Sequence, residues 1–486
     1  MHDLLEKNAI HRLVTPRSVA FYGASDKFGM GSVILNQLTA LGYEGQIYLI
    51  HPKQTEVMGR RAWPSVSDLP ETPDLAVVVL PAKVVGPILD ECGRKGVRSA
   101  IVVSGGFKET GAEGAAMEAE LREIVKKHNM RMIGPNCLGV LNTHHKFSTN
   151  TLPYVGSPGY IGLVSQSGSF VTQMFGPLAQ RYLGFSTAFS VGNEADVDLV
   201  DCLEYLGECP HTRVIAMYIE GIRRGRAFLE TARRVSAKKP IVAYYVGGSE
   251  TGGRAGLSHT GAMAGPDRLY DGIFRQAGVI RAETIEEVFD FCQVLGSMPA
   301  PHGNGVVVLT DSGGPGAAAA DACGRAGLNL PRLDQETKDR LVDVFPTTGS
   351  LNNPVDLTFH RVPTAYVDDI PKAILADENA DMLLMYLLMP IEVFVDAFRS
   401  MGVGEDEVAD AAVKIMEEQS EAVSSLNQFG KPVMGYTFRP LADEPIRAMM
   451  KKGVVVLPGT RRPARALKAL LTYANYKKRE SERTLG

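Results

Sequence analysis

Short apolar runs alternate with amphipathic stretches along nearly the whole chain. In the first third, the runs are Val19–Tyr22, Ile47–Ile50, Leu75–Leu80, Ala100–Val103 and Arg131–Ile133. The stretches between them carry apolar residues at helical spacing and include Val33–Leu41, Val85–Lys95 and Ala115–His128. Short strands separated by helices predict βαβ units and a parallel sheet.

The same pattern recurs twice more. After the loop at 150–158, the expected strands are Tyr160–Val164, Ser186–Ser190, Val214–Tyr218 and Ile241–Tyr245. After the Pro- and Gly-rich segment at 298–304, they are Val306–Leu309, Met382–Leu387, Val433–Tyr436 and Val454–Leu457. We therefore expect an α/β protein with three tandem doubly wound domains, at residues 1–150, 151–299 and 300–486.

Composition narrows the class of protein. The 486 residues carry 51 Lys and Arg against 55 Asp and Glu, a balance that argues against nucleic-acid binding. The six cysteines form no CxxC pair, which favours reduced thiols over disulfides or a zinc site. The longest apolar run, Met382–Ile391, is too short for the roughly 20 residues of a membrane span, and the N-terminus has no signal-peptide pattern. We expect a cytoplasmic enzyme that binds no membrane and no metal.

The turn after the first expected strand is rich in glycine. Its candidate ligand-binding residues are Gly23, Ala24, Ser25, Lys27, Gly29 and Gly31. Glycine lets backbone N–H groups approach a phosphate, and the following helix N-terminus favours negative charge. The spacing differs from the dinucleotide GxGxxG fingerprint. The turn therefore predicts a nucleotide site of Rossmann type, with a purely structural turn as the alternative.

The end of the second strand distinguishes between nucleotides. NAD enzymes carry an acid there for the ribose hydroxyl, but here the strand ends in His51, Pro52 and Lys53. A lysine suits a phosphorylated ribose, as in CoA or NADP, unless it is an ordinary solvated side chain. Further turns follow strands at the same sheet edge and should line the same crevice: Pro81, Ala82, Ser104, Gly105, Gly106, Phe107 and Asn136.

A second anion site is expected in the middle domain. There a strand leads through a polar turn into a helix, with the candidate residues Ser165, Gln166, Ser167, Gly168 and Ser169. Hydroxyls and free amides at a helix start suit phosphate, although serine is also an ordinary N-cap. Asn193 and Glu220 follow the next two strands and should lie at the same edge.

One histidine stands in a long glycine-rich segment, residues 247–265. His259 is surrounded there by glycines and by the hydroxyls of Ser258 and Thr260. Most histidines are ordinary surface or core residues, but one on such a loop is suited to nucleophilic attack on phosphorus. Glu220 would then hold the other ring nitrogen and fix the tautomer.

Taken together, these motifs resemble the α subunit of ADP-forming (NDP-forming) acyl-CoA synthetases, in the succinyl-CoA synthetase superfamily. The resemblance rests on the order of 23–31, 52–53, 80–82, 104–111, 134–139, 165–168, 190–196 and 258–261. The last third, with 311–316 and 353–356, resembles the extra domain of the acetyl-CoA synthetase branch. The resemblance implies a Rossmann-like CoA-binding domain followed by two flavodoxin-like domains.

The resemblance also implies a reaction, in which acid, CoA and ATP are interconverted with acyl-CoA, ADP and phosphate through an acyl phosphate. By motif match, His259 is the phosphorylated histidine and Glu220 the carboxylate that steadies it. The turns around 23–31, 52–53, 81–82, 104–107 and Asn136 match the CoA site, and 165–169 with Asn193 the phosphate site. Tyr244 departs from the family, because many members carry a lysine in that strand.

No stretch of the sequence supplies an ATP-grasp nucleotide site. The resemblance therefore implies a separate ATP-grasp β subunit that carries ATP or ADP and Mg²⁺ in an α2β2-type heteromer. It also implies a small carboxylic acid as substrate. Two alternatives stay open on the residues alone. One is an NADP-dependent oxidoreductase, and the other is a CoA-sensing regulatory protein without catalysis.

Overall fold

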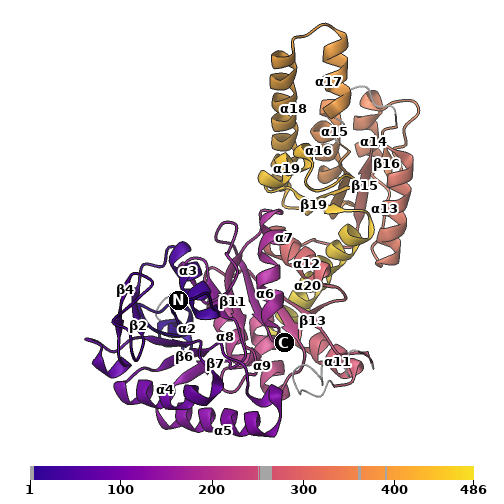
Figure 1. Ribbon diagram of the computed structural model, residues 1–486. Helices are drawn as coiled ribbons and strands as arrows, with labels where there is room; N and C mark the ends of the chain where they lie inside the picture. The colour runs from indigo at the N-terminus through magenta and orange to yellow at the C-terminus, as the bar shows by residue number, and fades with distance from the viewer. Residues whose placement is uncertain (1–4, 250, 252–264, 359–362, 389–390, 486) are drawn as a thin grey trace. The chain divides into compact units, whose positions relative to one another are not determined.

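The computed structural model describes residues 5–249, 251, 265–358, 363–388 and 391–485. The chain divides into two compact units. The first comprises residues 1–179 and 183–288, and the second comprises residues 180–182 and 289–486. Among the described residues, two sheets lie in the first unit and one in the second (Figure 1).

The first sheet has the strand order β3-β4-β2-β1-β5-β6-β7. Its strands are β1 Ser18–Tyr22, β2 Gln46–Ile50, β3 Glu56–Val57, β4 Arg60–Trp63, β5 Leu75–Val78, β6 Ser99–Val102 and β7 Arg131–Ile133. The helices are α2 His11–Val14, α3 Met30–Ala40, α4 Ala82–Lys95 and α5 Ala112–Lys127, with short 3₁₀ turns η1 Val66–Asp68 and η2 Lys108–Thr110. Every residue of β1 and β5 is buried, as expected for parallel strands covered on both faces.

The chain reverses its direction of winding at β1. This strand pairs in parallel with β2 on one side and with β5 on the other. Such a switch point opens a crevice beyond the carboxyl ends of the two strands. We call this the first crevice. The helices α4 and α5 lie side by side over one face of the sheet (Figure 1).

The second sheet has the order β14-β13-β12-β10-β11-β8-β9. Its strands are β8 Gly139–Asn142, β9 Phe147–Ser148, β10 Ile161–Ser165, β11 Phe185–Ser190, β12 Val214–Ile219, β13 Ile241–Tyr245 and β14 Ile280–Ala282. The helices are α6 Gly168–Gln173, α7 Phe175–Ala179, α8 Leu199–Glu208, α9 Gly225–Ser236 and α11 Asp267–Ala277, and α12 Ile285–Ser297 continues from the first unit into the second. Because β10 lies between β11 and β12, its carboxyl end is a second switch point.

The second sheet begins earlier in the chain than the sequence predicts. The strand series was expected to start after the loop at 150–158, but β8 and β9 already belong to it. They are antiparallel: β8 pairs with β11 from Gly139 opposite Ser190 to Asn142 opposite Thr187. The chain therefore enters the second sheet directly after the turn at 134–138, which brings that turn close to the end of β11.

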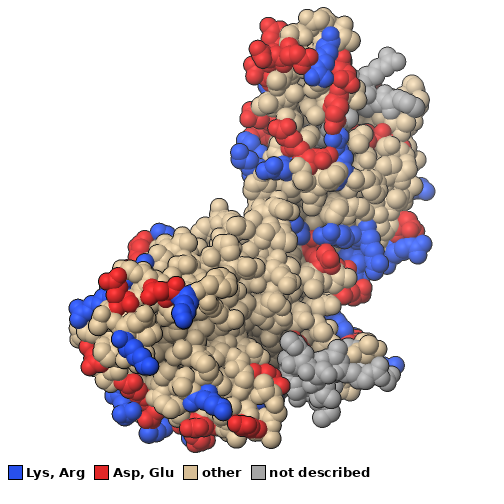
Figure 2. Space-filling view, in the orientation of Figure 1, with Lys and Arg blue, Asp and Glu red and all other residues tan. Residues whose placement is uncertain are grey.

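The two sheets of the first unit share one hydrophobic core. Phe21 of the first sheet and Phe189 and Met217 of the second belong to the same buried cluster. The two crevices are therefore parts of one packed body. Positive and negative side chains are interspersed on the face of this unit shown in Figure 2.

The second unit is built on a parallel sheet with the order β16-β15-β17-β18-β19. Its strands are β15 Val306–Thr310, β16 Val355–Asp356, β17 Met382–Tyr386, β18 Val433–Thr437 and β19 Val455–Pro458. The helices are α13 Gly313–Arg325, α14 Gln335–Leu341, α15 Pro363–Val367, α16 Asp369–Ala376, α17 Ile391–Ser400, α18 Glu405–Ser425, α19 Glu444–Lys451 and α20 Arg461–Leu485, with 3₁₀ turns η3 Val342–Val344 and η4 Leu426–Phe429. In the part of the chain that the structure describes, no helix has the length and apolar character needed to traverse a bilayer.

Candidate active site

The turn after β1 requires glycine where it packs against the rest of the first crevice. Gly23 has a φ of +105°, and a Cβ there would lie 2.2 Å from the carbonyl oxygen of Val79. A Cβ on Gly31 would lie 2.1 Å from the carbonyl oxygen of Gly23. At Gly29, by contrast, a Cβ would meet nothing within 4 Å. The turn is therefore tight at both ends and open in the middle, which fits a phosphate that approaches backbone N–H groups at the start of α3.

Several polar and apolar side chains surround this turn. Asp26 accepts a hydrogen bond of 2.7 Å from the N–H of Met58 and so ties the turn to the segment that follows Lys53. The side chain of Lys53 is exposed, and Phe28 is 97% exposed. Ala24, in contrast, is buried. Lys53 and Phe28 are thus available to a ligand in the first crevice.

The remaining loops of the first crevice meet as the sequence predicts. The Ser104 hydroxyl accepts a hydrogen bond of 3.0 Å from the N–H of Leu80, just before Pro81 and Ala82. A Cβ on Gly105 would lie 3.3 Å from Oδ1 of Asn136, so these two loops are neighbours. Phe107 differs from the others because its side chain is fully buried in the core beneath the loop.

The turn after β10, residues 165–169, divides into an inner and an outer part. The buried Ser165 hydroxyl donates to the carbonyl oxygen of Ser167 at 2.7 Å and accepts from its N–H at 3.1 Å. Ser169 is exposed, and its hydroxyl lies 3.4 Å from that of Ser167. Ser165 therefore shapes the turn, while the hydroxyls of Ser167 and Ser169 are placed to meet an anion.

Gln166 joins this turn to the end of β12. Its Oε1 accepts hydrogen bonds from the N–H of Glu220 at 2.6 Å and of Gly221 at 3.0 Å. Its Nε2 donates to the Gly221 carbonyl at 2.9 Å. Glu220 is buried, with 8% exposure. The structure thus brings Glu220 next to the phosphate turn, although the Gln166 amide is engaged by the protein itself.

His259 lies outside the described residues, as does the whole segment 252–264. The described chain on either side of that segment is well anchored. The Tyr245 hydroxyl, at the end of β13, donates to the carbonyl oxygen of Gly265 at 2.9 Å. The ring of Tyr245 stacks on that of Tyr270 with centroids 3.6 Å apart, and Tyr270 accepts a hydrogen bond from the N–H of Ile222. Tyr245 and Gly265 are therefore tied through Tyr270 to the turn that carries Glu220.

Asn193 is engaged by other side chains. It is only 3% exposed, and its Nδ2 donates to Glu109 at 2.6 Å and to Glu118 at 2.9 Å. Its Oδ1 accepts from Asn136 at 3.3 Å. Asn193 follows β11 of the second sheet, and its side chain is thus bound to residues of the segments that surround the first sheet.

Four charged residues around Asn193 were not among the predicted site residues, although two of them lie in the segments 104–111 and 190–196 that carry the resemblance. They are Glu109, Glu118, Glu194 and Arg223. Arg223 donates to the main-chain carbonyls of Asn193 and Glu194 at 2.6 and 2.7 Å. Burial raises the pKa of the Glu194 carboxyl to about 7, although Arg223 and the amide of Gln166 oppose this shift. Sequence offers one signal for such a group, namely charged residues placed directly after strand-end loops.

The sheet of the second unit has a switch point of its own, at β15. Asp311 follows β15, and burial raises the pKa of its carboxyl. Asp356, at the end of β16, accepts hydrogen bonds from the N–H and hydroxyl of Thr358. The second unit therefore carries a pair of neighbouring carboxyl groups at its carboxyl edge, on the motifs that resembled the extra domain.

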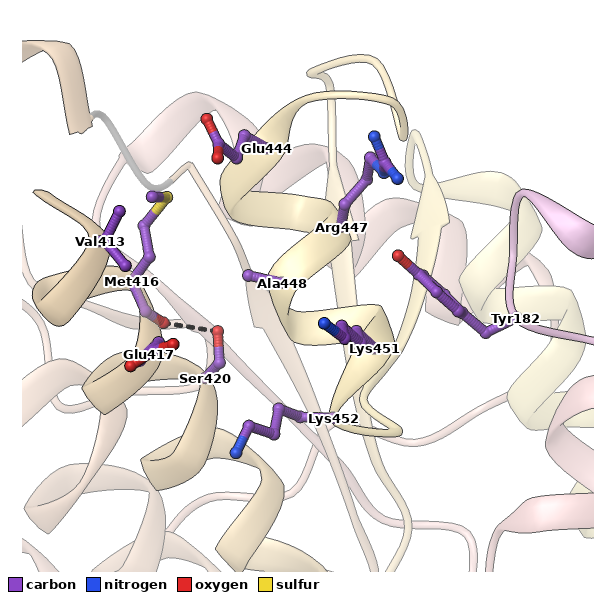
Figure 3. Close-up of a pocket in the computed structure, with 10 residues that line it drawn as sticks. All are labelled: Tyr182, Val413, Met416, Glu417, Ser420, Glu444, Arg447, Ala448, Lys451 and Lys452. Carbon is purple, nitrogen blue, oxygen red and sulfur yellow. Dashed lines mark hydrogen bonds between the residues drawn. The ribbon is translucent and has the colours of Figure 1, made fainter. Parts of the chain in front are cut away.

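A cavity of about 600 Å³ lies elsewhere in the second unit, between α18 and α19 (Figure 3). Its lining combines apolar side chains such as Met416 and Ala448 with side chains of both charges. Lys452 is held by Glu421 at 2.6 Å. None of the residues predicted as site residues lines it. Across the described residues, no group of three or more His, Cys, Asp or Glu side chains is arranged to hold a metal ion.

Three family models match the chain in succession. A CoA binding domain matches residues 17–143, a succinyl-CoA ligase like flavodoxin domain matches 158–295, and a Ligase-CoA domain matches 306–443. The fold and the two crevices thus define a CoA ligase built from three α/β parts. This confirms the fold class expected from the sequence.

Relatives that match most of the chain show which kind of CoA ligase it belongs to. The chain is 36% identical over 481 residues to the α subunit of acetate–CoA ligase (ADP-forming) I of Pyrococcus furiosus, covering 98% of this chain and 100% of that subunit. It is 37% identical over 361 residues to the 4-hydroxybutyrate–CoA ligase (ADP-forming) of Nitrosopumilus maritimus, covering 72% and 52%. The dinucleotide forming acetyl-coenzyme A synthetase 1 of Ca. Korarchaeum cryptofilum, solved with phosphate and ADP, superposes with a TM-score of 0.86 at 31% identity, covering 97% and 99%.

The chain belongs to the α subunits of the ADP-forming acyl-CoA synthetases. It is therefore part of an acid–CoA ligase, as the resemblance implied. These matches leave the oxidoreductase and the non-catalytic sensor without support.

Proposed function

We propose that the first crevice of this chain binds CoA and that His259 carries the phosphoryl group between the two halves of the reaction. One observation supports this most strongly. The end of β12, with Glu220, is bonded through Gln166 to the turn at 165–169, and both lie in the same packed unit as the first crevice. The residues that we propose for CoA, for phosphate and for orienting the histidine therefore belong to one compact unit.

The first crevice fits CoA by its own chemistry. The open middle of the turn at 23–31 gives a phosphate access to backbone N–H groups. Lys53 offers a cation for the phosphorylated ribose, and the exposed ring of Phe28 offers an apolar face for the base. CoA supplies the thiol that takes the acyl group. The residues of this chain bind and orient it.

The phosphoryl site uses residues from three strand ends. Ser167, Ser169 and the amides at the start of α6 would hold the phosphate, and His259 would accept the phosphoryl group. Glu220 would hold the imidazole in the tautomer that leaves one nitrogen free to attack. A covalent phosphoenzyme divides a reaction of three substrates into separate steps.

The nucleotide belongs to a partner in this proposal. A β subunit with an ATP-grasp fold would bind ATP or ADP with Mg²⁺ and exchange the phosphoryl group with His259. The acid is a small carboxylic acid. Its identity is best determined with a panel that includes acetate and 4-hydroxybutyrate, the acids in the names of the two relatives above.

The test is to detect phosphohistidine. The purified chain is incubated with acetyl-CoA, or the acyl-CoA preferred in the panel, and labelled phosphate. The expected label is acid-labile and alkali-stable and maps to His259. It should disappear in His259→Ala and persist in the control His302→Ala, which removes an exposed histidine of the second unit. A label in His259→Ala, or one that maps to another histidine, contradicts the proposal.

A further inference from the structure

Four residues connect the two crevices of the first unit, and we call them the connecting chain: Glu109, Asn193, Glu194 and Gln166. Side-chain hydrogen bonds join Glu109 to Asn193 and Glu194 to Gln166, and the peptide bond joins Asn193 to Glu194. At one end lies the loop 104–107 of the first crevice, and at the other lies the turn of Glu220. In the sequence, these residues belong to separate motifs.

The first half of the connecting chain starts at backbone N–H groups of the crevice loop. Oε1 of Glu109 accepts hydrogen bonds from the N–H of Gly106 at 2.6 Å and of Phe107 at 3.1 Å. Oε2 of the same carboxylate accepts from Nδ2 of Asn193 at 2.6 Å. Because one carboxylate binds both, the loop and Asn193 are fixed relative to each other.

The second half continues from the next residue. Oε2 of Glu194 accepts a hydrogen bond of 2.9 Å from Nε2 of Gln166, and Oε1 accepts one of 3.0 Å from the N–H of Leu199. Oε1 of Gln166 then accepts from the N–H groups of Glu220 and Gly221. Hydrogen bonds on both sides of the peptide bond between Asn193 and Glu194 thus connect the loop of the first crevice with the backbone of the Glu220 turn.

The buried and strained position of Glu194 in the connecting chain lowers the free energy of unfolding. Glu194 is 5% exposed and has a φ of +52°, a left-handed conformation that a residue other than glycine seldom adopts. A buried carboxyl group and a strained backbone both oppose folding unless the surroundings fix them. Here Lys108 donates to the main-chain carbonyl of Asn193 at 2.5 Å, and Arg223 donates to the carbonyls of Asn193 and Glu194. A carboxyl group maintained under such conditions points to a role beyond packing.

We propose that the connecting chain couples the two crevices, so that phosphate bound at 165–169 tightens the binding of CoA, with Glu194 as the central positioning residue. This rests on the proposed function of the two crevices. The physical reason is shared ordering, because the ligand that arrives first fixes the loops at both ends, and the second ligand loses less entropy on binding. By linkage, CoA tightens phosphate binding by the same factor.

A purely structural role makes a different prediction. If the connecting chain only stabilised the fold, breaking it would lower stability or weaken both ligands, but the factor by which phosphate changes CoA affinity would persist. That factor is therefore the quantity to measure, because it is a ratio of two affinities of the same protein.

Two variants break the connecting chain at different places. Glu194→Gln replaces a carboxylate that accepts from two donors by an amide with a single acceptor oxygen, so the N–H of Leu199 or the amide of Gln166 then faces an N–H group. Glu109→Gln does the same between Asn193 and the loop amides, on a partly exposed residue whose replacement leaves the buried Glu194 in place. The matched control is Glu204→Gln on α8, which removes an exposed carboxylate bonded to Arg234.

The experiment is calorimetric titration of the full chain with CoA, with and without saturating inorganic phosphate. In the wild type and in Glu204→Gln, phosphate should lower the Kd of CoA about fivefold, the lower end of typical coupling factors. In Glu194→Gln and Glu109→Gln, the change should fall below about twofold. Melting curves identify a variant that has not folded. In that case the other variant shows whether the connecting chain couples CoA and phosphate binding.

The outcomes separate this proposal from the proposed function. If the wild type binds no CoA, the proposed function of the first crevice fails. If the wild type binds CoA but phosphate leaves its Kd unchanged, or if either folded variant keeps the full phosphate effect, the connecting chain does not couple the sites. In those two cases the proposed function is untouched.

Discussion

Individual carboxyl groups in the first unit occupy very different environments. Asp26 is exposed and accepts a backbone hydrogen bond, whereas Glu194 lies almost completely within the protein. The charged groups that face Glu194 are Arg223, Asp198 and Lys108. Burial prevails over the favourable cations and raises the pKa of Glu194 to about 7. Such a group titrates near neutral pH and links its protonation to folding.

This shift predicts how Glu194→Gln changes stability with pH. In the wild type, the unfolded chain loses this proton near the ordinary glutamate pKa of 4.5, but the folded chain keeps it until about pH 7. Between these values the folded state binds more protons, so rising pH destabilises the wild type, by roughly 3 kcal/mol in total. Glu194→Gln has no such carboxyl group and does not lose this stability as the pH rises. Its melting temperature relative to wild type should therefore rise between pH 5 and pH 8.

The measurement is a set of thermal unfolding curves of both proteins at several pH values. Glu204→Gln serves again as the control, because its carboxylate is exposed. A difference between Glu194→Gln and wild type that does not change with pH would contradict the raised pKa of Glu194.

At the scale of elements, parallel strands with helices between them determine where the crevices open. β1 lies between β2 and β5, and β10 lies between β11 and β12, so each sheet has its switch point at the first strand of its parallel part. Glycine then decides how closely the first turn can follow the sheet. At Gly31 the start of α3 touches the backbone of Gly23.

Replacing Gly31 should therefore damage the turn, whereas replacing Gly29 should not. The Cβ of Gly31→Ala would lie 2.1 Å from a carbonyl oxygen, so the backbone must move, at a typical free-energy cost of about 1–3 kcal/mol. The Cβ of Gly29→Ala would meet open space, and the φ of −171° at this residue suits any amino acid. Thermal unfolding should show a clear loss of stability for Gly31→Ala and a small change for Gly29→Ala.

The same pair of variants tests the packing directly. Equal melting temperatures for the two variants would mean that the turn is not held against α3 as the structure shows. Calorimetry with CoA adds a second reading, because a displaced turn should also bind CoA more weakly than the wild type.

Sequence predicted the parallel strands well but could not predict their pairing. Apolar runs such as Val19–Tyr22 and Ile241–Tyr245 are buried on both faces, and so their pattern is strong. The two residues of β9 or β16 carry too little pattern to detect. β8 follows the last parallel strand of the first sheet, and only its antiparallel pairing with β11 assigns it to the second.

The candidate site, like the strand pairing, could be predicted only in part from the sequence. Backbone turns at 23–31 and 165–169 were visible as glycine and serine patterns after strands. The connecting chain was not visible in this way, because its contacts join residues far apart in the sequence. Glu109 is 84 residues away from Asn193, and Gln166 is 28 residues away from Glu194. Contacts of that kind arise only when two sheets pack, and a single sequence does not encode them as a local pattern.

At the scale of the whole molecule, the chain is one part of a ligase. It covers all of the Pyrococcus furiosus α subunit but 52% of the Nitrosopumilus maritimus ligase, so this family includes both separate α subunits and longer chains. In the proposed function, a partner subunit holds ATP and Mg²⁺.

The partial reaction should therefore separate cleanly from the complete one. With acyl-CoA and phosphate, the purified chain should become phosphorylated, because both crevices and His259 belong to it. With ADP added, the chain alone should make no ATP, since the proposed nucleotide site is on the partner. Adding the purified β subunit should start ATP formation and consume the label, and His259→Ala should block this while CoA still binds in the first crevice. The measurement is a coupled ATP assay run beside the labelling experiment. ATP formed by the chain alone, free of any partner, would show that the nucleotide site is on this chain.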